Sequence, residues 1–359
     1  MSDNIKSVKS GWVNMPLKEP YVLSFRSIKS IDSVWVFIEY DSGRLGIGEA
    51  VPLTGYGFET LSSIRTSVHR LSERVIGCSK EIAMHICREA GRKAPFASSS
   101  VASALDFPDW ISDGFEIKPT SLVFPIASFS DKSILKKTFE DGFLRGFRHF
   151  KMKIGKDLKV DIESALFILE EYSSKDFTLR FDANQAFSYD EAVRFSDVLS
   201  SVDYQKSLWL EQPLCVDDWG NMERLCTVTD FPMMLDESIY SKEDIIRAKK
   251  IGCKAIKLKL AKYNGMDECI KLARYAKNIG LDVTLGNGVA TDIGNLSEAL
   301  IYSRDSGCFV NGLEFNGFAK LTKHLAFPYL KIKDAGEVSW DSDESNLDKI
   351  LNSFIKENS

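Results

Sequence analysis

Short hydrophobic runs, each ending in a charged residue, recur at regular intervals in the second half of the chain. The runs are RHFKMKIG, TLRFDAN, LWLEQP, PMMLDES and AIKLKLAK, and their charged residues are Lys153, Asp182, Glu211, Asp236 and Lys259. Successive charged residues are 23 to 29 positions apart. This interval fits one strand followed by one helix. The pattern therefore predicts repeated strand–helix units with a charge at the end of each strand.

The segments between these runs have helical periodicity. Ile162, Ala165, Leu166 and Leu169 lie at positions i, i+3, i+4 and i+7, which predicts a helix with one apolar face. Residues 266–279 repeat the pattern, and Gly280 is expected to end that helix. Between about residues 119 and 316, eight strand candidates alternate with helices. This alternation predicts parallel βαβ units closed into a barrel, with the active site at the C-terminal ends of the strands.

The first 118 residues have a different pattern. VWVFIEY (34–40) and RLGIGEA (44–50) flank Asp41-Ser42-Gly43, and this arrangement predicts a β-hairpin. Helical patterns follow at about 59–77 and 80–91, whereas residues 93–105 are mostly small and show little periodicity. We therefore expect an α+β region before the barrel.

Composition and charge narrow the class of protein. A chain of 359 residues is long enough for one large barrel and a smaller domain. Its net charge of −5 provides no basic field for nucleic acid or anionic membranes, and no apolar run of 18 residues predicts a membrane span. The seven cysteines form no CxxC pair, and the N-terminus lacks the apolar segment of a secretory signal. We expect a cytoplasmic protein with reduced thiols.

Two pairs of lysines are expected inside the barrel. Strand side chains alternate between the two faces of a sheet, so Lys151 shares a face with Lys153, and Lys257 with Lys259. The intervening apolar residues suit the face covered by helices. Buried lysines require a partner, so these four need carboxylates or a chemical role. The nearby Lys262 is expected at the surface or at the rim of the barrel mouth.

Three converging carboxylates favour a bound cation. Two carboxylates about 4 Å apart repel by roughly 4 kcal/mol at an effective dielectric constant near 20. Oxygen ligands without Cys or His favour Mg²⁺ over zinc, and none of the four histidines falls at a strand end in the same rhythm as the charged residues. One Mg²⁺ ion between two amines favours removal of the α-proton of a carboxylate substrate, through a metal-stabilised enolate and with a lysine as the base.

The order of KMKIG, FDANQAF, LEQPL, LDES and LKLAKYNG resembles the enolase superfamily, in its muconate-lactonizing-enzyme subgroup. DSGRLGIGEAVPL and YGFET near the N-terminus fit the same resemblance. It implies a modified TIM barrel, (β/α)7β, over residues 119–325, an α+β capping domain over 1–118, and a C-terminal segment, 326–359, that packs back on the cap. It also implies that Lys153 and Lys259 are the acid/base pair, that Asp182, Glu211 and Asp236 bind one Mg²⁺, and that Lys151 and Asn184 support them.

Departures from the subgroup pattern concern the substrate. Asn287 stands at the seventh strand end, where many members carry an acid. Glu314-Phe315-Asn316 stands where related dipeptide epimerases carry the D-x-D pair that holds an amino group. Together with Arg26 and Tyr56 from the expected cap loops, Asn287, Glu314 and Asn316 form the predicted substrate-binding set.

These residues predict a magnesium-dependent isomerase that acts on a small carboxylate, most directly a racemase or epimerase of a dipeptide or amino-acid derivative. The same site is compatible with a cycloisomerase, or with a lyase that performs syn-elimination of the o-succinylbenzoate synthase type. A Schiff-base lysine aldolase leaves the three acids unexplained. A non-catalytic binding protein leaves the whole set of five residues unexplained. The sequence is compatible with a homo-oligomer and does not define its size.

Overall fold

The computed structural model describes residues 3–22, 27–52, 58–111, 116–201, 208–287, 289–310, 312–325, 330–333 and 336–340. Within these ranges, no helix combines the length and the apolar character that a membrane span requires.

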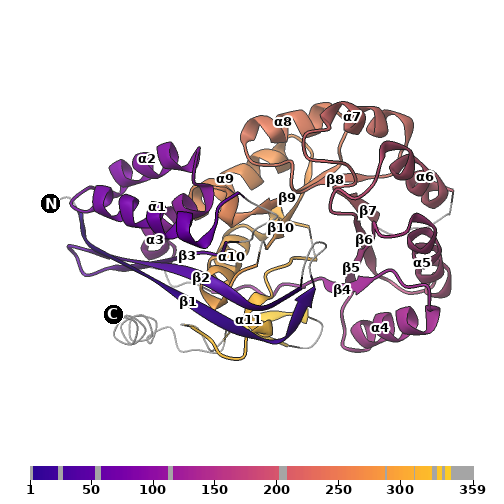
Figure 1. Ribbon diagram of the computed structural model, residues 1–359, viewed down its shortest axis with the longest axis horizontal. Coiled ribbons are helices and arrows are strands. Elements are labelled where there is room, and N and C mark those ends of the chain that lie inside the picture. Colours follow the sequence, from indigo (N-terminus) through magenta and orange to yellow (C-terminus); the bar gives the residue numbers. More distant parts are fainter. Residues whose placement is uncertain are drawn as a thin grey trace.

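A parallel sheet forms the larger part of the molecule. Its strands are neighbours in chain order: β4 (Phe124–Ala127), β5 (His149–Lys153), β6 (Thr178–Asp182), β7 (Leu208–Glu211), β8 (Met233–Leu235), β9 (Ala255–Lys259) and β10 (Asp282–Gly286). The helices between and after them lie on the outside of the curved sheet (Figure 1): α4 (Lys132–Leu144), α5 (Leu158–Glu171), α6 (Tyr189–Ser200), α7 (Trp219–Val228), α8 (Lys242–Lys250), α9 (Gly265–Asn278) and α10 (Asp292–Arg304).

An eighth segment joins the two edges of this sheet. On one side, the Val310 amide donates to the Val283 carbonyl of β10 at 2.8 Å. On the other side, the Val123 amide donates to the Leu313 carbonyl at 2.9 Å, and Leu122 forms a parallel bridge with Leu313. The predicted (β/α)7β barrel is confirmed, with backbone hydrogen bonds rather than a regular strand at its eighth position.

The N-terminal region forms a separate antiparallel sheet covered by helices. Its strands are β1 (Ile5–Val22), β2 (Ser27–Tyr40) and β3 (Leu45–Ala50), and its helices are α1 (Leu61–Val75), α2 (Lys80–Gly91) and α3 (Pro95–Ile111). The predicted hairpin is confirmed, because the Tyr40 amide donates to the Arg44 carbonyl and Gly43 has a φ of +84°. The long strand β1 was not predicted.

Helix α3 explains why residues 93–105 lack a visible period. Nearly all of its side chains are buried, so no polar face marks the helix in the sequence. Its backbone also contacts β3 closely. A Cβ atom on Gly46 or Gly48 would lie 1.8 or 1.9 Å from the carbonyl oxygen of Ala104 or Ser100. Small residues on both elements therefore permit a contact that larger side chains would prevent.

A half-buried carboxylate connects this N-terminal sheet with the barrel. Glu49 of β3 accepts hydrogen bonds from the Thr291 amide at 3.0 Å and the Gly294 amide at 2.8 Å, at the N-terminus of α10. A negative charge at a helix N-terminus is favourable because the first amides lack partners within the helix. This contact places the end of β3 beside the loop that follows β10, at the mouth of the barrel.

The C-terminal residues contact both parts of the molecule. Near α11 (Gly317–Lys320), the Thr322 amide donates to the Pro16 carbonyl of β1. Farther along, β11 (Leu330–Ile332) pairs with β12 (Val338–Trp340), and the Val338 amide donates to the Thr120 carbonyl before β4. The described residues of the segment 326–359 thus contact the start of the barrel. The contact with the N-terminal sheet comes from residues 317–322, which precede this segment. The helix expected near the chain end lies outside the described residues.

His149, at the start of β5, gives a prediction for the pH dependence of stability. Burial, assisted by Arg180, lowers the pKa of His149 to about 4, below the unfolded value near 6.5. The unfolded chain therefore binds a proton that the native state excludes, and stability falls as pH decreases through this window. Between pH 7 and pH 5, the wild-type free energy of unfolding should fall by about 2 kcal/mol more than that of His149→Asn.

Urea unfolding at both pH values measures this difference. The Asn amide can replace the contact between the His149 Nδ1 and the Thr178 hydroxyl, which is 2.8 Å long. The exposed His69→Asn serves as the control and should follow the wild type. Equal losses in His149→Asn and the wild type would contradict the prediction.

Candidate active site

The parallel register brings the predicted charges to one edge of the sheet. Lys153 pairs with Asp182, and Asp182 with Glu211, across β5, β6 and β7. Asp236 follows the last residue of β8, and Lys259 is the last residue of β9. The structure therefore brings all five residues together at the C-terminal ends of the strands, where barrel enzymes place their active sites.

Lys151 lies at the centre of this carboxylate cluster. Its Nζ atom is 2.7 Å from Asp182 Oδ2, 3.0 Å from Glu211 Oε1 and 3.0 Å from Glu314 Oε1. Burial alone would lower the pKa of Lys151, but the three carboxylates raise it well above its usual value. Lys151 is thus a charged structural partner of the acids.

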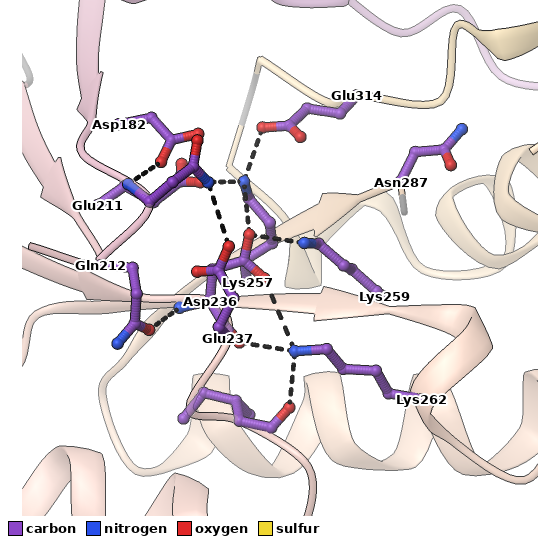
Figure 2. A network of polar contacts seen from close by, with 12 residues as sticks. Asp182, Glu211, Gln212, Asp236, Glu237, Lys257, Lys259, Lys262, Asn287 and Glu314 are labelled. Atoms are coloured by element: carbon purple, nitrogen blue, oxygen red, sulfur yellow. Dashed lines mark hydrogen bonds and ion pairs between the residues drawn. The ribbon is translucent and has the colours of Figure 1, made fainter. Parts of the chain in front are cut away.

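Lys257 also lies among these carboxylates, and it reaches them from β9, whereas Lys151 reaches them from β5. The Lys257 Nζ atom contacts Glu211 Oε1, lies 3.2 Å from Asp236 Oδ2 and 2.9 Å from Glu314 Oε1. Its side chain is fully buried. Figure 2 shows the Lys257 ammonium between carboxylates that come from three different strand ends.

Arg180 completes the inner part of the network and was not predicted. Its Nε atom is 3.0 Å from Glu211 Oε2, and one terminal nitrogen is 2.6 Å from Glu314 Oε1. Arg180 precedes Asp182 by two positions on β6, so it shares the inward face. The same alternation that identified the lysines could have identified Arg180.

The outer lysines lie at the mouth on opposite sides of the carboxylates. Lys153 Nζ is 2.5 Å from Asp182 Oδ2 and donates to Asn184 Oδ1. Lys259 Nζ is 2.7 Å from Asp236 Oδ2. Strands β6, β7 and β8 separate β5 from β9, so the two amines approach the mouth from different directions. The Lys153 side chain is 39% exposed and that of Lys259 is 6% exposed.

Glu237 is a further member of the site that sequence reasoning missed. Its Oε1 atom accepts a hydrogen bond from the side-chain Nδ2 of Asn184 at 3.1 Å. Burial, with Asp236 next to it, raises the pKa of Glu237 to about 7. Glu237 directly follows Asp236 in the LDES motif, and this position could have identified it from the sequence.

Lys262 differs from its prediction. We expected it at the surface or rim, but its side chain is buried and donates to the backbone carbonyls of Asp236 at 2.8 Å and Ile239 at 3.3 Å. The short 3₁₀ turn η1 (Leu260–Lys262) after β9 directs it back under the end of β8. Burial lowers the pKa of Lys262 to about 8, although Asp236 opposes this shift.

Unusual backbone conformations follow two of the acidic strand ends. Asn184 and Gln185 after β6, and Gln212 after β7, have positive φ values of 44°, 68° and 37°. Such conformations in residues other than glycine persist where the surroundings hold them, often at functional sites. Gln212 Oε1 accepts hydrogen bonds from the amides of Asp236 and Ser238, which holds the loop after β8 in place (Figure 2).

The predicted substrate-binding residues have different positions. Asn287 follows β10 and accepts a hydrogen bond from the Val289 amide at 2.7 Å. Glu314 points inward to the basic network, and the half-buried Asn316 precedes α11. Arg26 and Tyr56 lie outside the described residues.

The donor set fits a magnesium ion. Asp182 and Glu211 contact one ammonium, and Glu211 and Asp236 contact another, so the three carboxylates converge. Three buried carboxylate oxygens of this region have no hydrogen-bond partner among the described residues: Glu211 Oε2, Asp236 Oδ1 and Glu237 Oε2. Among the described residues, no three His, Cys, Asp or Glu side chains are placed to hold a metal ion together. The ammonium groups of Lys151 and Lys257 lie between the carboxylates.

Most of this chain is similar in sequence to proteins of known activity. Residues 136–307 match the family described as enolase C-terminal domain-like. The N-succinyl-L-Arg/Lys racemase of Bacillus cereus is 25% identical over 358 residues, which cover 94% of this chain and 95% of that protein. The L-Ala-D/L-Glu epimerase of Francisella tularensis subsp. novicida is 27% identical over 307 residues, covering 82% and 86%.

Solved structures show the same fold. The dipeptide epimerase from Enterococcus faecalis, complexed with Mg and L-Leu-L-Tyr, has a TM-score of 0.81 at 21% identity and covers 95% of this chain and 98% of its own. The muconate lactonizing enzyme from Pseudomonas putida has a TM-score of 0.78 at 22% identity, with 94% of each chain covered. Residues 136–307 of this chain thus match an enolase C-terminal-like domain, and the proteins that the chain resembles are racemases, epimerases and muconate lactonizing enzymes.

Proposed function

We propose that this chain inverts the α-carbon of an amino-acid derivative whose amino group is acylated. The observation that carries the proposal is the position of Lys153 and Lys259, whose amines approach the carboxylate cluster from β5 and from β9. An amine on each side of a flat intermediate can remove a proton from one face and return a proton to the other. Inversion of configuration follows.

The other residues prepare this proton transfer. Asp182, Glu211 and Asp236 would hold Mg²⁺, which supplies positive charge to the substrate carboxylate as the α-proton leaves. Asn184 positions Lys153 through the hydrogen bond to its Nζ atom. Asp236 positions Lys259 in the same way, at 2.7 Å. A proton accepted by one lysine returns to solvent, and the opposite lysine supplies the new one.

The charges of the site favour an acylated substrate nitrogen. The network holds six basic side chains, Lys151, Lys153, Arg180, Lys257, Lys259 and Lys262, and five carboxylates, Asp182, Glu211, Asp236, Glu237 and Glu314. Glu314, at the place associated with amine binding, already contacts three cations. A free ammonium would add a further positive charge beside Glu314, which these three cations already surround. The name of the Bacillus cereus relative, an N-succinyl amino-acid racemase, supports this choice.

Deuterium incorporation tests the proposal. With Mg²⁺ in D₂O, N-succinyl or N-acetyl L-amino acids should gain deuterium at the α-carbon and convert to the D-form, followed by proton NMR and chiral chromatography. Dipeptides with a free amino group and the same C-terminal residue should react at least tenfold more slowly. Removal of the metal with EDTA should stop turnover, and added Mg²⁺ should restore it.

Other outcomes would replace this function. An unsaturated product without α-inversion would indicate elimination, and a lactone product would indicate cycloisomerisation, for which the muconate lactonizing enzymes share the fold. Turnover that survives EDTA and is trapped by borohydride would indicate Schiff-base chemistry. Faster reaction of the free dipeptides would place this chain with epimerases of that class.

We also propose that this enzyme is located in the cytoplasm. All seven cysteines are free. Free thiols are typical of reducing compartments, so they support a cytoplasmic enzyme that acts on a small carboxylate.

A further inference from the structure

Lys257 occupies the space in which the proposed site requires a cation. Its ammonium contacts Glu211 and lies 3.2 Å from Asp236, and these are two of the three proposed magnesium ligands. A fully buried ammonium needs carboxylates around it, and three carboxylates need a cation between them. Lys257 and the carboxylates therefore satisfy one another within this chain without an added ion.

Lys151 does not have the same role. It binds Asp182 and Glu211 from β5, but the third ligand, Asp236, is not among its contacts. Lys257, from β9, bridges Glu211 and Asp236 and thereby connects the ligands of β7 and β8. An ion that binds the same two oxygens, Glu211 Oε1 and Asp236 Oδ2, would take this bridging position.

Glu314 offers the Lys257 ammonium a second counter-ion. Its Oε1 atom lies 2.9 Å from Lys257 Nζ and belongs to the eighth segment of the barrel, whereas the proposed ligands are at the ends of β6, β7 and β8. Lys257 is a long, flexible side chain, so a small rotation can weaken its contacts with Glu211 and Asp236 while that with Glu314 remains. The buried lysine thus keeps a partner after an ion enters.

We propose that Lys257 is a built-in competitor of the divalent ion: its ammonium is shared by Glu211, Asp236 and Glu314 without the ion, and it keeps only its contact with Glu314 when the ion binds. This inference rests on the proposed magnesium site. It has two consequences. The ion binds more weakly than the carboxylates alone would allow, because it must displace the Lys257 ammonium and is then repelled by it at short range. The metal-free fold is stable, because the carboxylates keep a counter-charge.

Binding of Mg²⁺ alone, measured by isothermal titration calorimetry on the EDTA-treated and desalted full chain, tests the proposal. Lys257→Met removes the ammonium and keeps an unbranched side chain, and it should bind Mg²⁺ at least tenfold more tightly than the wild type. Glu314→Gln removes the second counter-ion and should bind Mg²⁺ several-fold more weakly. The double variant, Lys257→Met with Glu314→Gln, distinguishes displacement of Lys257 from a general change in charge. Without the ammonium, Glu314→Gln should no longer weaken Mg²⁺ binding, whereas a general change in charge would weaken it to the same extent as in the wild type.

Thermal unfolding provides a second readout that does not depend on activity. Without metal, Lys257→Met should unfold at a lower temperature than the wild type, because Glu211 and Asp236 lose a shared cation. Mg²⁺ should raise its unfolding temperature by more than it raises that of the wild type. If Lys257→Met does not fold even with Mg²⁺, the same titration is made with Lys257→Gln, whose amide can still donate to Glu211.

Lys80→Met is the matched control. Lys80 is a largely buried lysine of the cap that pairs with Asp106 at 2.9 Å and Asp109 at 2.8 Å, far along the chain from the barrel ligands. Its removal should leave Mg²⁺ affinity unchanged. Equal or weaker Mg²⁺ binding by Lys257→Met than by the wild type would overturn the role of Lys257 alone. Absence of Mg²⁺ binding in both proteins would overturn the magnesium site, and the proposed function with it.

Discussion

Lys259→Ala should abolish racemisation and still exchange the α-proton of one substrate enantiomer. Loss of a positioned acid or base typically lowers the rate by about 10²–10⁴-fold. Inversion needs both amines, whereas exchange needs only the amine on the side from which the proton leaves. In Lys259→Ala, Lys153 remains beside Asp182 and Asn184 and can remove and return the proton of one enantiomer. Lys153→Ala should retain exchange of the other enantiomer.

Proton NMR of each pure enantiomer in D₂O separates exchange from inversion. Lys156→Ala is the matched control, because Lys156 is an exposed lysine shortly after β5 and should behave as the wild type. Calorimetric unfolding verifies that both site variants are folded. Wild-type racemisation by both variants, or exchange of both enantiomers by either one, would contradict the assignment of one lysine to each face.

Glu211→Gln should lower the free energy of unfolding by about 3–5 kcal/mol in the absence of metal, the cost of breaking a buried ion pair. Glu211 is fully buried, and its two oxygens face Lys151, Lys257 and Arg180. The amide keeps the shape of the side chain but leaves these three cations with one carboxylate fewer. A loss of this size is a large part of the stability of a typical domain, about 5–15 kcal/mol.

Urea unfolding followed by circular dichroism measures this loss. Glu171→Gln is the control, because Glu171 forms an exposed ion pair with Lys136 at 2.6 Å, and such pairs contribute about 0–1 kcal/mol. If Glu211→Gln costs no more than Glu171→Gln, the inner network does not support the fold. Mg²⁺ binding should also weaken in Glu211→Gln, since a proposed ligand is lost, and should stay unchanged in Glu171→Gln.

Periodicity alone predicted much of the barrel. Strands that alternate with amphipathic helices produce a recognisable sequence pattern. One face of each helix must be apolar, and the buried strands consist of nearly uninterrupted apolar runs. Helix α3 shows no such pattern, since it is buried on nearly every side. The long strand β1 was also missed.

The sequence by itself determined which side chains face into the barrel and reach its mouth, because strand alternation and the ends of parallel strands define these positions locally. Lys153, Asp182, Glu211, Asp236 and Lys259 were found in this way. Only the tertiary structure decided which of these groups are partners. Closure of the barrel places Glu314 against Lys257, and the turn after β9 buries Lys262 beneath Asp236. Distances between side chains on different strands depend on curvature, turns and packing, and a pattern along one chain carries no measure of them.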